Sequence, residues 1–238
     1  MPNEPTAAGS ETTPSEPGKR VVDLILMLLT AAAGATDALA YLGLGGVFTA
    51  NMTGNLVLFG IAGASGADMH LARAGVAVTA FTVGLVIAYR MTAVPGLTRW
   101  LWPRRVSLSL VVALALQTTL AVIWAQTAAH PGRLVDMGLV ALSGAAMGMQ
   151  TAAARRLAKA GITTTFVTGT LTSVAEDLSH GSTKNVLRRC AALLSLVAGA
   201  LGGAVALRVA PALAAGIAPL LVMAALLIAG LRLHGRRS

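Results

Sequence analysis

The sequence predicts an all-α integral membrane protein with about six transmembrane helices, two re-entrant or broken helical segments and two repeats of inverted topology. This prediction rests on the composition, the lengths of the apolar runs and the placement of the positive charges. Of the 238 residues, 55% are hydrophobic and 11% are charged, and the mean hydropathy is +0.75. A soluble domain carries roughly a quarter of its residues as charges, so this composition indicates a chain that lies in a lipid bilayer.

Residues 1–20 precede the first apolar run and are predicted to form a disordered cytoplasmic tail, because they are rich in Pro, Glu, Thr and Ser and hold no aromatic residue. Lys19 and Arg20 before an apolar run also resemble the start of a signal peptide. However, the run continues past the alanine-rich stretch at 31–35 and holds Asp23. Both features favour a spanning helix over a cleaved signal.

Six apolar runs are long enough to cross a bilayer, since a spanning helix needs about twenty residues. They lie at 21–44, 72–95, 106–128, 134–154, 186–207 and 210–232. Two further runs, 46–64 and 162–178, are shorter and contain many polar residues. We therefore predict one membrane domain made of a first repeat, 21–130, and a second repeat, 131–233, followed by a basic cytoplasmic tail at 234–238.

The positive charges decide whether the two short runs cross the membrane. If both cross, Lys and Arg divide ten to eight between the two sides; if neither crosses, fifteen lie on one side and three, Arg73, Arg133 and Arg208, on the other. Lys and Arg gather on the cytoplasmic side of membrane proteins. The second division therefore predicts six spans, two re-entrant segments and both termini in the cytoplasm.

The two re-entrant segments share a sequence pattern. The stretch 53–56, Thr-Gly-Asn-Leu, matches Thr-Gly-Thr-Leu at 168–171, 115 residues later, and the stretch 34–38 matches 148–152 at an offset of 114. With three spans in each half, the second half is inserted upside down. Transporters built from such repeats hold their site near the bilayer midplane. A broken helix is tolerated there only if it is buried in protein or faces a water-filled cavity.

Asp37 lies well inside the first span, about sixteen residues from its start. A charge at the bilayer centre costs about 2.5–3.5 kcal/mol, so we expect an acid there to serve function or to bond a buried partner. Burial favours the neutral carboxyl, which would suit proton coupling. The alternative is that Asp37 only satisfies the broken backbone of the re-entrant segment. Tyr41 follows one helical turn later on the same face and fits either the site or packing.

Asn51, Thr53 and Asn55 give the first re-entrant segment its polar character, and we predict that they line a pore or a substrate-binding site. Their side chains could instead cap the backbone groups that the break in the helix frees. The candidate lining residues of the second half are Gln150, Thr168 and Thr170.

Other function classes find little support in the sequence. No nucleophile–base motif is present, so the chain is predicted not to be an enzyme. One cysteine, Cys190, and four scattered histidines predict no metal site and no cofactor. The net charge of +9 is not arranged as a basic stripe with aromatic residues, so no nucleic-acid partner is predicted. Small-residue patterns at 144–148 and 199–203 indicate close helix packing, either within the chain or in a homo-oligomer.

The run Asp37–Asn55, DALAYLGLGGVFTANMTGN, is similar to the signature of the YoaK-like family of bacterial membrane proteins, domain of unknown function 1275. Members pair a D-A-x-[SA]-Y-L…V-F-x-x-N-M-T-G-N stretch with a second-half M-G-x-Q…T-T…T-G-T/N stretch, which is found here at 147–150 and 163–170. Thr151 stands where relatives often carry Asn. The resemblance implies a bacterial plasma (inner) membrane protein and brings no established activity.

These observations favour a small-solute transporter or channel whose midplane site lies between the two repeats. The expected partners are the lipid bilayer and an unidentified small solute, with protons as a candidate coupling ion. The alternative is a membrane scaffold or regulatory module that transports nothing.

Overall fold

A computed structural model of the protein describes residues 16–93, 102–157, 167–181, 183 and 185–233. Most of the predicted N-terminal tail, the basic tail at 234–238 and the threonine run at 163–165 lie outside these residues. Within the described ranges the secondary structure is helical and contains no strand. The elements in chain order are α1 (Glu16–Gly43), α2 (Met52–Ser65), α3 (Asp68–Thr92), α4 (Arg104–Gln126), α5 (Arg133–Leu157), α6 (Val167–Ser179), α7 (Val186–Val209), the short 3-10 helix η2 (Pro211–Gly216) and α8 (Ile217–Leu233).

Six helices in the described part of the chain are long and apolar enough to cross a membrane, counting η2 and α8 as one. The other two, α2 and α6, have 14 and 13 residues. At 1.5 Å per residue these are too short to cross hydrocarbon about 30 Å thick. The predicted all-α membrane fold, with six spans and two short helical segments, is therefore confirmed.

The first helix begins earlier than the sequence predicts. α1 starts at Glu16 rather than at residue 21, so the last five residues of the predicted disordered tail, 16–20, are helical. Pro17 accounts for the difference, because proline is favoured in the first turn of a helix, where its missing N–H has no helical partner to lose.

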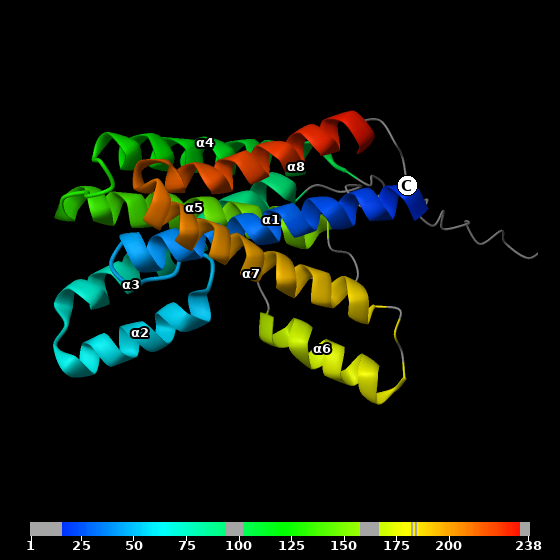
Figure 1. The fold of residues 1–238 in the computed structure, drawn as a ribbon, viewed down its shortest axis with the longest axis horizontal. Coiled ribbons are helices and arrows are strands. Elements are labelled where there is room, and N and C mark those ends of the chain that lie inside the picture. Colours follow the sequence, from blue (N-terminus) through cyan, green and yellow to red (C-terminus); the bar gives the residue numbers. More distant parts are fainter. Residues whose placement is uncertain (1–15, 94–101, 158–166, 182, 184, 234–238) are drawn as a thin grey trace, which may run out of the picture.

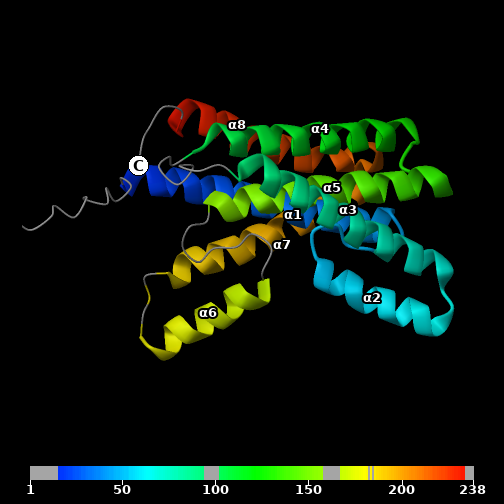
Figure 2. The same cartoon turned by 180° about the vertical axis from the view of Figure 1, so that it is seen from behind.

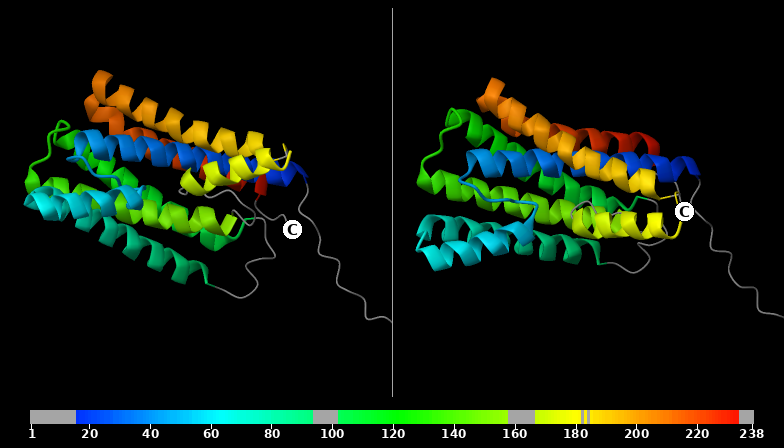
Figure 3. Two further views of the ribbon diagram at one scale, coloured as in Figure 1. Left: turned by 90° about the horizontal axis from the view of Figure 1, so that it is seen from below. Right: turned by 60° about the horizontal axis from the view of Figure 1, so that its bottom comes forward.

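The helices form three layers (Figures 1 and 3). The middle layer has the order α7, α1, α5, α3, in which α1 packs on α7 and α5 packs on α3. The second layer is made of α8, which packs on α1, and α4, which packs on α5. α2 and α6 lie on the opposite face, against α3 and α7 respectively. The largest core cluster lies where α1 meets α4 and α8, around Leu29, Leu110 and Val222.

The two crossings in the middle layer, α1–α7 and α3–α5, are both made through glycines. A Cβ added to Gly34 of α1 would lie 2.9 Å from the backbone nitrogen of Ala200 on α7, and one added to Gly148 of α5 would lie 2.8 Å from that of Leu85 on α3. In both crossings the missing side chain lets the two backbones touch.

The partner helices contribute glycines in the same way. Gly199 of α7 faces the carbonyl of Ala31 on α1, and Gly84 of α3 faces the carbonyl of Ala145 on α5, each too closely to admit a side chain. Each of these glycines, and each residue it faces, stands 114 or 115 positions from its counterpart in the other crossing. The two crossings thus share these four glycine contacts.

Candidate functional site

The chain leaves α1 and folds back so that the loop 44–51 lies beside Asp37. Gly45 and Gly46 make this turn with φ of 82° and 80°, a conformation that favours glycine. The Oδ1 atom of Asp37 accepts hydrogen bonds from the backbone N–H of Thr49 at 2.8 Å and of Ala50 at 2.7 Å. One carboxyl oxygen therefore satisfies two backbone donors that lipid could not satisfy.

Asn55 holds the same loop from the first turn of α2. Its side chain is fully buried. Its Oδ1 accepts from the N–H of Phe48 at 2.8 Å, and its Nδ2 donates to the carbonyl of Phe48. A primary amide suits this position because it offers an acceptor and a donor side by side. Asn55 thus pairs with both backbone groups of one loop residue, as the capping alternative anticipates.

α5 supplies a third support, which the sequence did not indicate. The hydroxyl of Ser143 donates to the hydroxyl of Thr49 at 2.8 Å, and both side chains are buried. Ser143 is a polar residue within an apolar run, which could have marked it as a buried hydrogen-bonding group. Its partner could not be predicted, because Thr49 lies 94 residues away in the sequence. The loop is therefore held by α1, α2 and α5 together.

Tyr41 and Thr53 flank this loop and Asn51 ends it, and all three are exposed. Tyr41 stacks on Phe48 with ring centroids 5.0 Å apart. Asn51 is the N-cap of α2, and its Oδ1 accepts from the N–H of Gly54 at 3.4 Å. The structure thus gathers all five candidates of the first half at one place, around the loop 44–51 and the start of α2.

Gln150 lies elsewhere, in a buried polar cluster between α1, α4 and α5. Its Nε2 donates to the carbonyl of Leu29 at 2.9 Å, and its Oε1 accepts from Nε2 of Gln117 at 3.4 Å. The Oε1 atom of Gln117 is buried and has no hydrogen-bond partner among the described residues. Gln150 therefore ties three helices together, and no described hydrogen bond links it to Asp37.

The other second-half candidates lie in the first turn of α6. Thr168 is exposed and Thr170 is buried. Thr151, the counterpart of Asp37, has a buried hydroxyl without a hydrogen-bond partner among the described residues. The run 163–165, which corresponds to the loop that Asp37 holds, lies outside the described residues.

The two short helices are arranged end to end. Figures 1 and 2 show that α2 and α6 both begin near the middle of the bundle and extend toward its opposite ends. Their N-terminal ends therefore face the middle from two directions. The N-terminus of a helix carries roughly half a positive charge, so this region of the bundle presents two electropositive helix ends beside exposed Asn51, Thr53 and Thr168.

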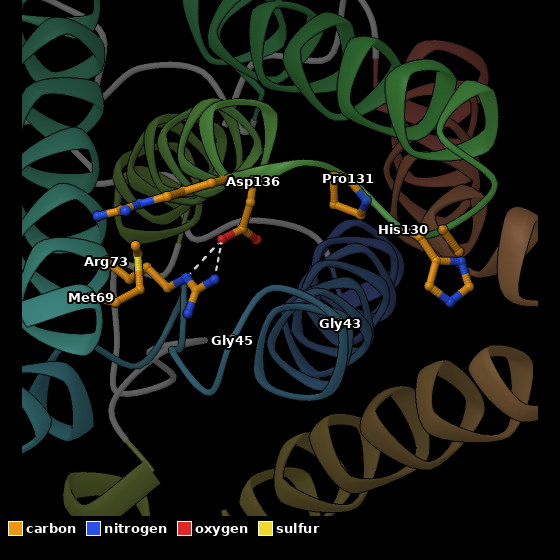
Figure 4. A pocket seen from close by; sticks show the side chains of 9 residues that line it. Gly43, Gly45, Met69, Arg73, His130, Pro131 and Asp136 are labelled. Atoms are coloured by element: carbon orange, nitrogen blue, oxygen red, sulfur yellow. Dashed lines mark hydrogen bonds and ion pairs between the residues drawn. The ribbon is translucent and has the colours of Figure 1, made fainter. Parts of the chain in front are cut away.

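A cavity of about 540 Å³ lies at the end of the bundle where α3 and α5 begin. Its lining includes Gly45, Met69, His130 and the ion pair of Arg73 with Asp136 (Figure 4). Nη2 and Nε of Arg73 lie 2.6 Å and 2.7 Å from Oδ2 of Asp136. Arg73 is one of the three positive charges predicted to lie on the non-cytoplasmic side, and its pairing with Asp136 is not predicted from the sequence. The available signal was Asp136, an acid at the start of an apolar run.

Comparison with known proteins places the chain among membrane proteins without an assigned activity. The family model described as "Protein of unknown function (DUF1275)" matches residues 25–229. The UPF0700 transmembrane protein YoaK of Bacillus subtilis (strain 168) is 39% identical over 155 residues, which are 65% of this chain and 66% of that protein. The match thus spans slightly less than two thirds of that relative. No solved structure matches the chain.

Proposed function

The chain belongs to the DUF1275 family of membrane proteins, and on this premise we propose that it is a small-solute transporter or channel of the bacterial plasma membrane. Its site would lie at mid-membrane, where α2 and α6 begin. The observation that carries the proposal is the pair of short helices whose N-terminal ends face each other, halfway along one face of the bundle of spanning helices. Half-helix ends at this depth are the binding elements of many transporters.

The helix packing supports two inverted repeats, 21–130 and 131–233. α1 packs on α7 and α5 packs on α3, so the first long helix of each half contacts the second long helix of the other half. α1 and α5 run in opposite directions (Figure 1). The matching glycines at offsets of 114 and 115 are what a pseudo-twofold relation between the halves would produce.

The exposed polar groups support a wet site. Asn51, Thr53 and Thr168 stand at the starts of α2 and α6, halfway along the bundle, with exposed side chains. Lipid offers such groups no hydrogen-bonding partner, so they are better matched to water or a polar solute. The charge distribution of the sequence supports cytoplasmic termini, which would put the starts of α3 and α5 at the outer surface.

Asp37→Asn tests the role of the acid sharply. The substitution removes the charge and the titratable proton but keeps an Oδ1 atom that can accept from Thr49 and Ala50. We expect the variant to insert and purify like the wild type, while flux into proteoliposomes falls to background. Flux is measured with a pH-sensitive dye inside the vesicles and by light scattering, with formate, nitrate, urea and glycerol as probe solutes.

Asp68→Asn is the matched control, because Asp68 is an exposed acid in the first turn of α3. It should leave flux unchanged. Equal flux in wild type and Asp37→Asn would remove Asp37 from the transport mechanism.

The alternative function is a non-transporting scaffold or regulatory module. One observation favours it: Asp37 and Asn55 both hydrogen bond to the loop 44–51, as purely structural residues would. This alternative predicts no flux of any probe solute in the wild type and a partner protein that co-purifies in defined amount.

A further inference from the structure

We propose that two ion pairs at opposite ends of the bundle, Arg73–Asp136 and Arg188–Asp23, are the outer and inner gates of the mid-membrane site. The inference rests on the proposed transport function and adds alternating opening of the two ends to it. It is supported by the placement of the outer pair, by its contact with the loop 44–51, and by the matching position of the inner pair.

The outer pair joins α3 to α5 at the end where both helices begin. Asp136 is buried, with 5% of its side chain exposed, and Arg73 has 19% exposed. Figure 4 shows the two side chains pointing toward each other beside the cavity. A buried pair of this kind holds its helices together, because separating the partners would leave an uncompensated charge in a poorly solvated place.

The outer pair also touches the loop of the candidate site. A Cβ added to Gly45 would lie 2.6 Å from Nε of Arg73, so the guanidinium packs directly on the loop backbone. Asp136 and Ser143 lie two turns apart on one face of α5, and Ser143 bonds Thr49 in the same loop. Movement of α3 away from α5 would therefore disturb the loop that Asp37 holds.

The inner pair joins α7 to α1 at the opposite end, where these two helices begin (Figure 1). Nη2 of Arg188 lies 2.5 Å from Oδ1 of Asp23, with 33% and 22% of the side chains exposed. The Nε atom of Arg188 has no hydrogen-bond partner among the described residues. The inner pair thus uses fewer donors and is better solvated than the outer pair, so it is expected to open at lower cost.

The two pairs occupy matching positions. Arg188 follows Arg73 by 115 residues, and Asp136 follows Asp23 by 113. In each pair an arginine near the start of the second long helix of one half meets an acid near the start of the first helix of the other half. The glycine contacts lie between the two ends, so each helix pair has a close contact near its middle and one of the two ion pairs at the end where its arginine lies.

This arrangement suits alternating access. When one ion pair breaks, its helices can separate at that end while the glycine contact stays in place, and the ion pair at the other end keeps the second entrance closed. Rigid helices that move about a small fixed contact are a common form of conformational switch.

The test measures access to the site and needs no known solute. A single cysteine is introduced as Thr53→Cys into a Cys190→Ser protein, and a charged thiol reagent is added to one side of oriented membrane vesicles. We expect Arg73→Gln to raise the labelling rate from the outer side by about tenfold, with no change from the inner side. Arg188→Gln should do the reverse.

Matched controls distinguish the effect of breaking the ion pair from the effect of removing a positive charge. Arg133 lines the same cavity as Arg73 and is exposed, so Arg133→Gln should leave labelling unchanged. Arg73→Lys keeps the charge, and the double variant Arg73→Asp with Asp136→Arg restores an ion pair, so both should label close to the wild-type rate. If Arg73→Gln does not yield folded protein, Asp136→Asn breaks the same ion pair from the α5 side and should raise labelling from the outer side in the same way.

The proposal that the two ion pairs act as gates would be rejected if the wild type and both Gln variants were labelled at equal rates. It would also be rejected if either Gln variant were labelled faster from both sides. Labelling of the restored double variant as fast as Arg73→Gln would lead to the same conclusion. Because labelling does not depend on flux, a wild type that transports nothing would reject the proposed function separately, whatever the labelling shows.

Discussion

At the scale of single residues, an acid and an amide have the same structural role: both hydrogen bond to the backbone of the loop 44–51. Asp37 satisfies two backbone donors of the loop, and Asn55 satisfies a donor and an acceptor of Phe48. Polar side chains in a membrane helix are costly unless they are bonded, and these two are bonded to the loop backbone, which lipid would otherwise leave without partners. Asn51, at the end of the loop, is the N-cap of α2, and its side chain is exposed.

These differences predict unequal effects on stability. Asn55→Leu leaves two backbone groups of Phe48 without partners, and at about 1–3 kcal/mol each the loss is about 2–6 kcal/mol. Asn51→Ala removes only a helix cap and should cost about 0.5–2 kcal/mol. Thermal unfolding of the purified variants in one detergent measures both. A larger loss in Asn51→Ala than in Asn55→Leu would show that the amide pairing is not what holds the loop.

At the scale of helices, the glycine contacts set the spacing of the middle layer. Ala at Gly34 or Gly148 would press on backbone atoms of the facing helix, which cannot rotate away as a side chain can. We expect each of these substitutions to cost at least about 1–3 kcal/mol, as overpacking does. The two losses should be similar, because the surroundings match.

Gly202→Ala and Gly230→Ala are the controls for these substitutions. Both glycines are helical and have nothing within 4 Å of an added Cβ, so alanine should be neutral or should stabilise by up to about 1 kcal/mol through its better helix propensity. The midpoint of thermal unfolding distinguishes the two groups. A control variant that is destabilised as much as Gly34→Ala would mean that helix packing is not responsible.

The positions of the helices were largely predictable from the sequence, whereas the hydrogen-bond partners of the candidate site residues were not. Apolar run length located all six spans, because hydrocarbon thickness fixes how many residues a span needs. The short run predicted at 46–64 contains most of α2, which begins later, at Met52, after its N-cap Asn51. The bonds of Asp37 to Thr49 depend on how the loop folds back, and that of Ser143 depends on α5 packing beside it. Gln150 matched the first-half pattern but lies in a separate buried cluster with Gln117, because position along a helix does not determine which neighbour it faces.

At the scale of the whole molecule, the orientation of α2 and α6 remains a prediction of the charge distribution. Ala64→Cys at the end of α2 and Ser179→Cys at the end of α6 are exposed positions for a labelling test in the Cys190→Ser protein. We expect position 64 to label only from outside and position 179 only from the cytoplasm. Labelling of both from the same side would contradict two inverted re-entrant segments.

The pairing of α1 with α7 and α8 also determines the order in which the protein can be assembled. α1 is made before the other five spans described here, and the two helices on which it packs most extensively are made after the other three. During synthesis α1 is therefore present in the bilayer before α7 is made, and Gly34 lacks the α7 backbone that later packs on it. Completion of the fold is delayed until the C-terminal spans insert, and a chain truncated before α7 would leave its first helix without its main partners.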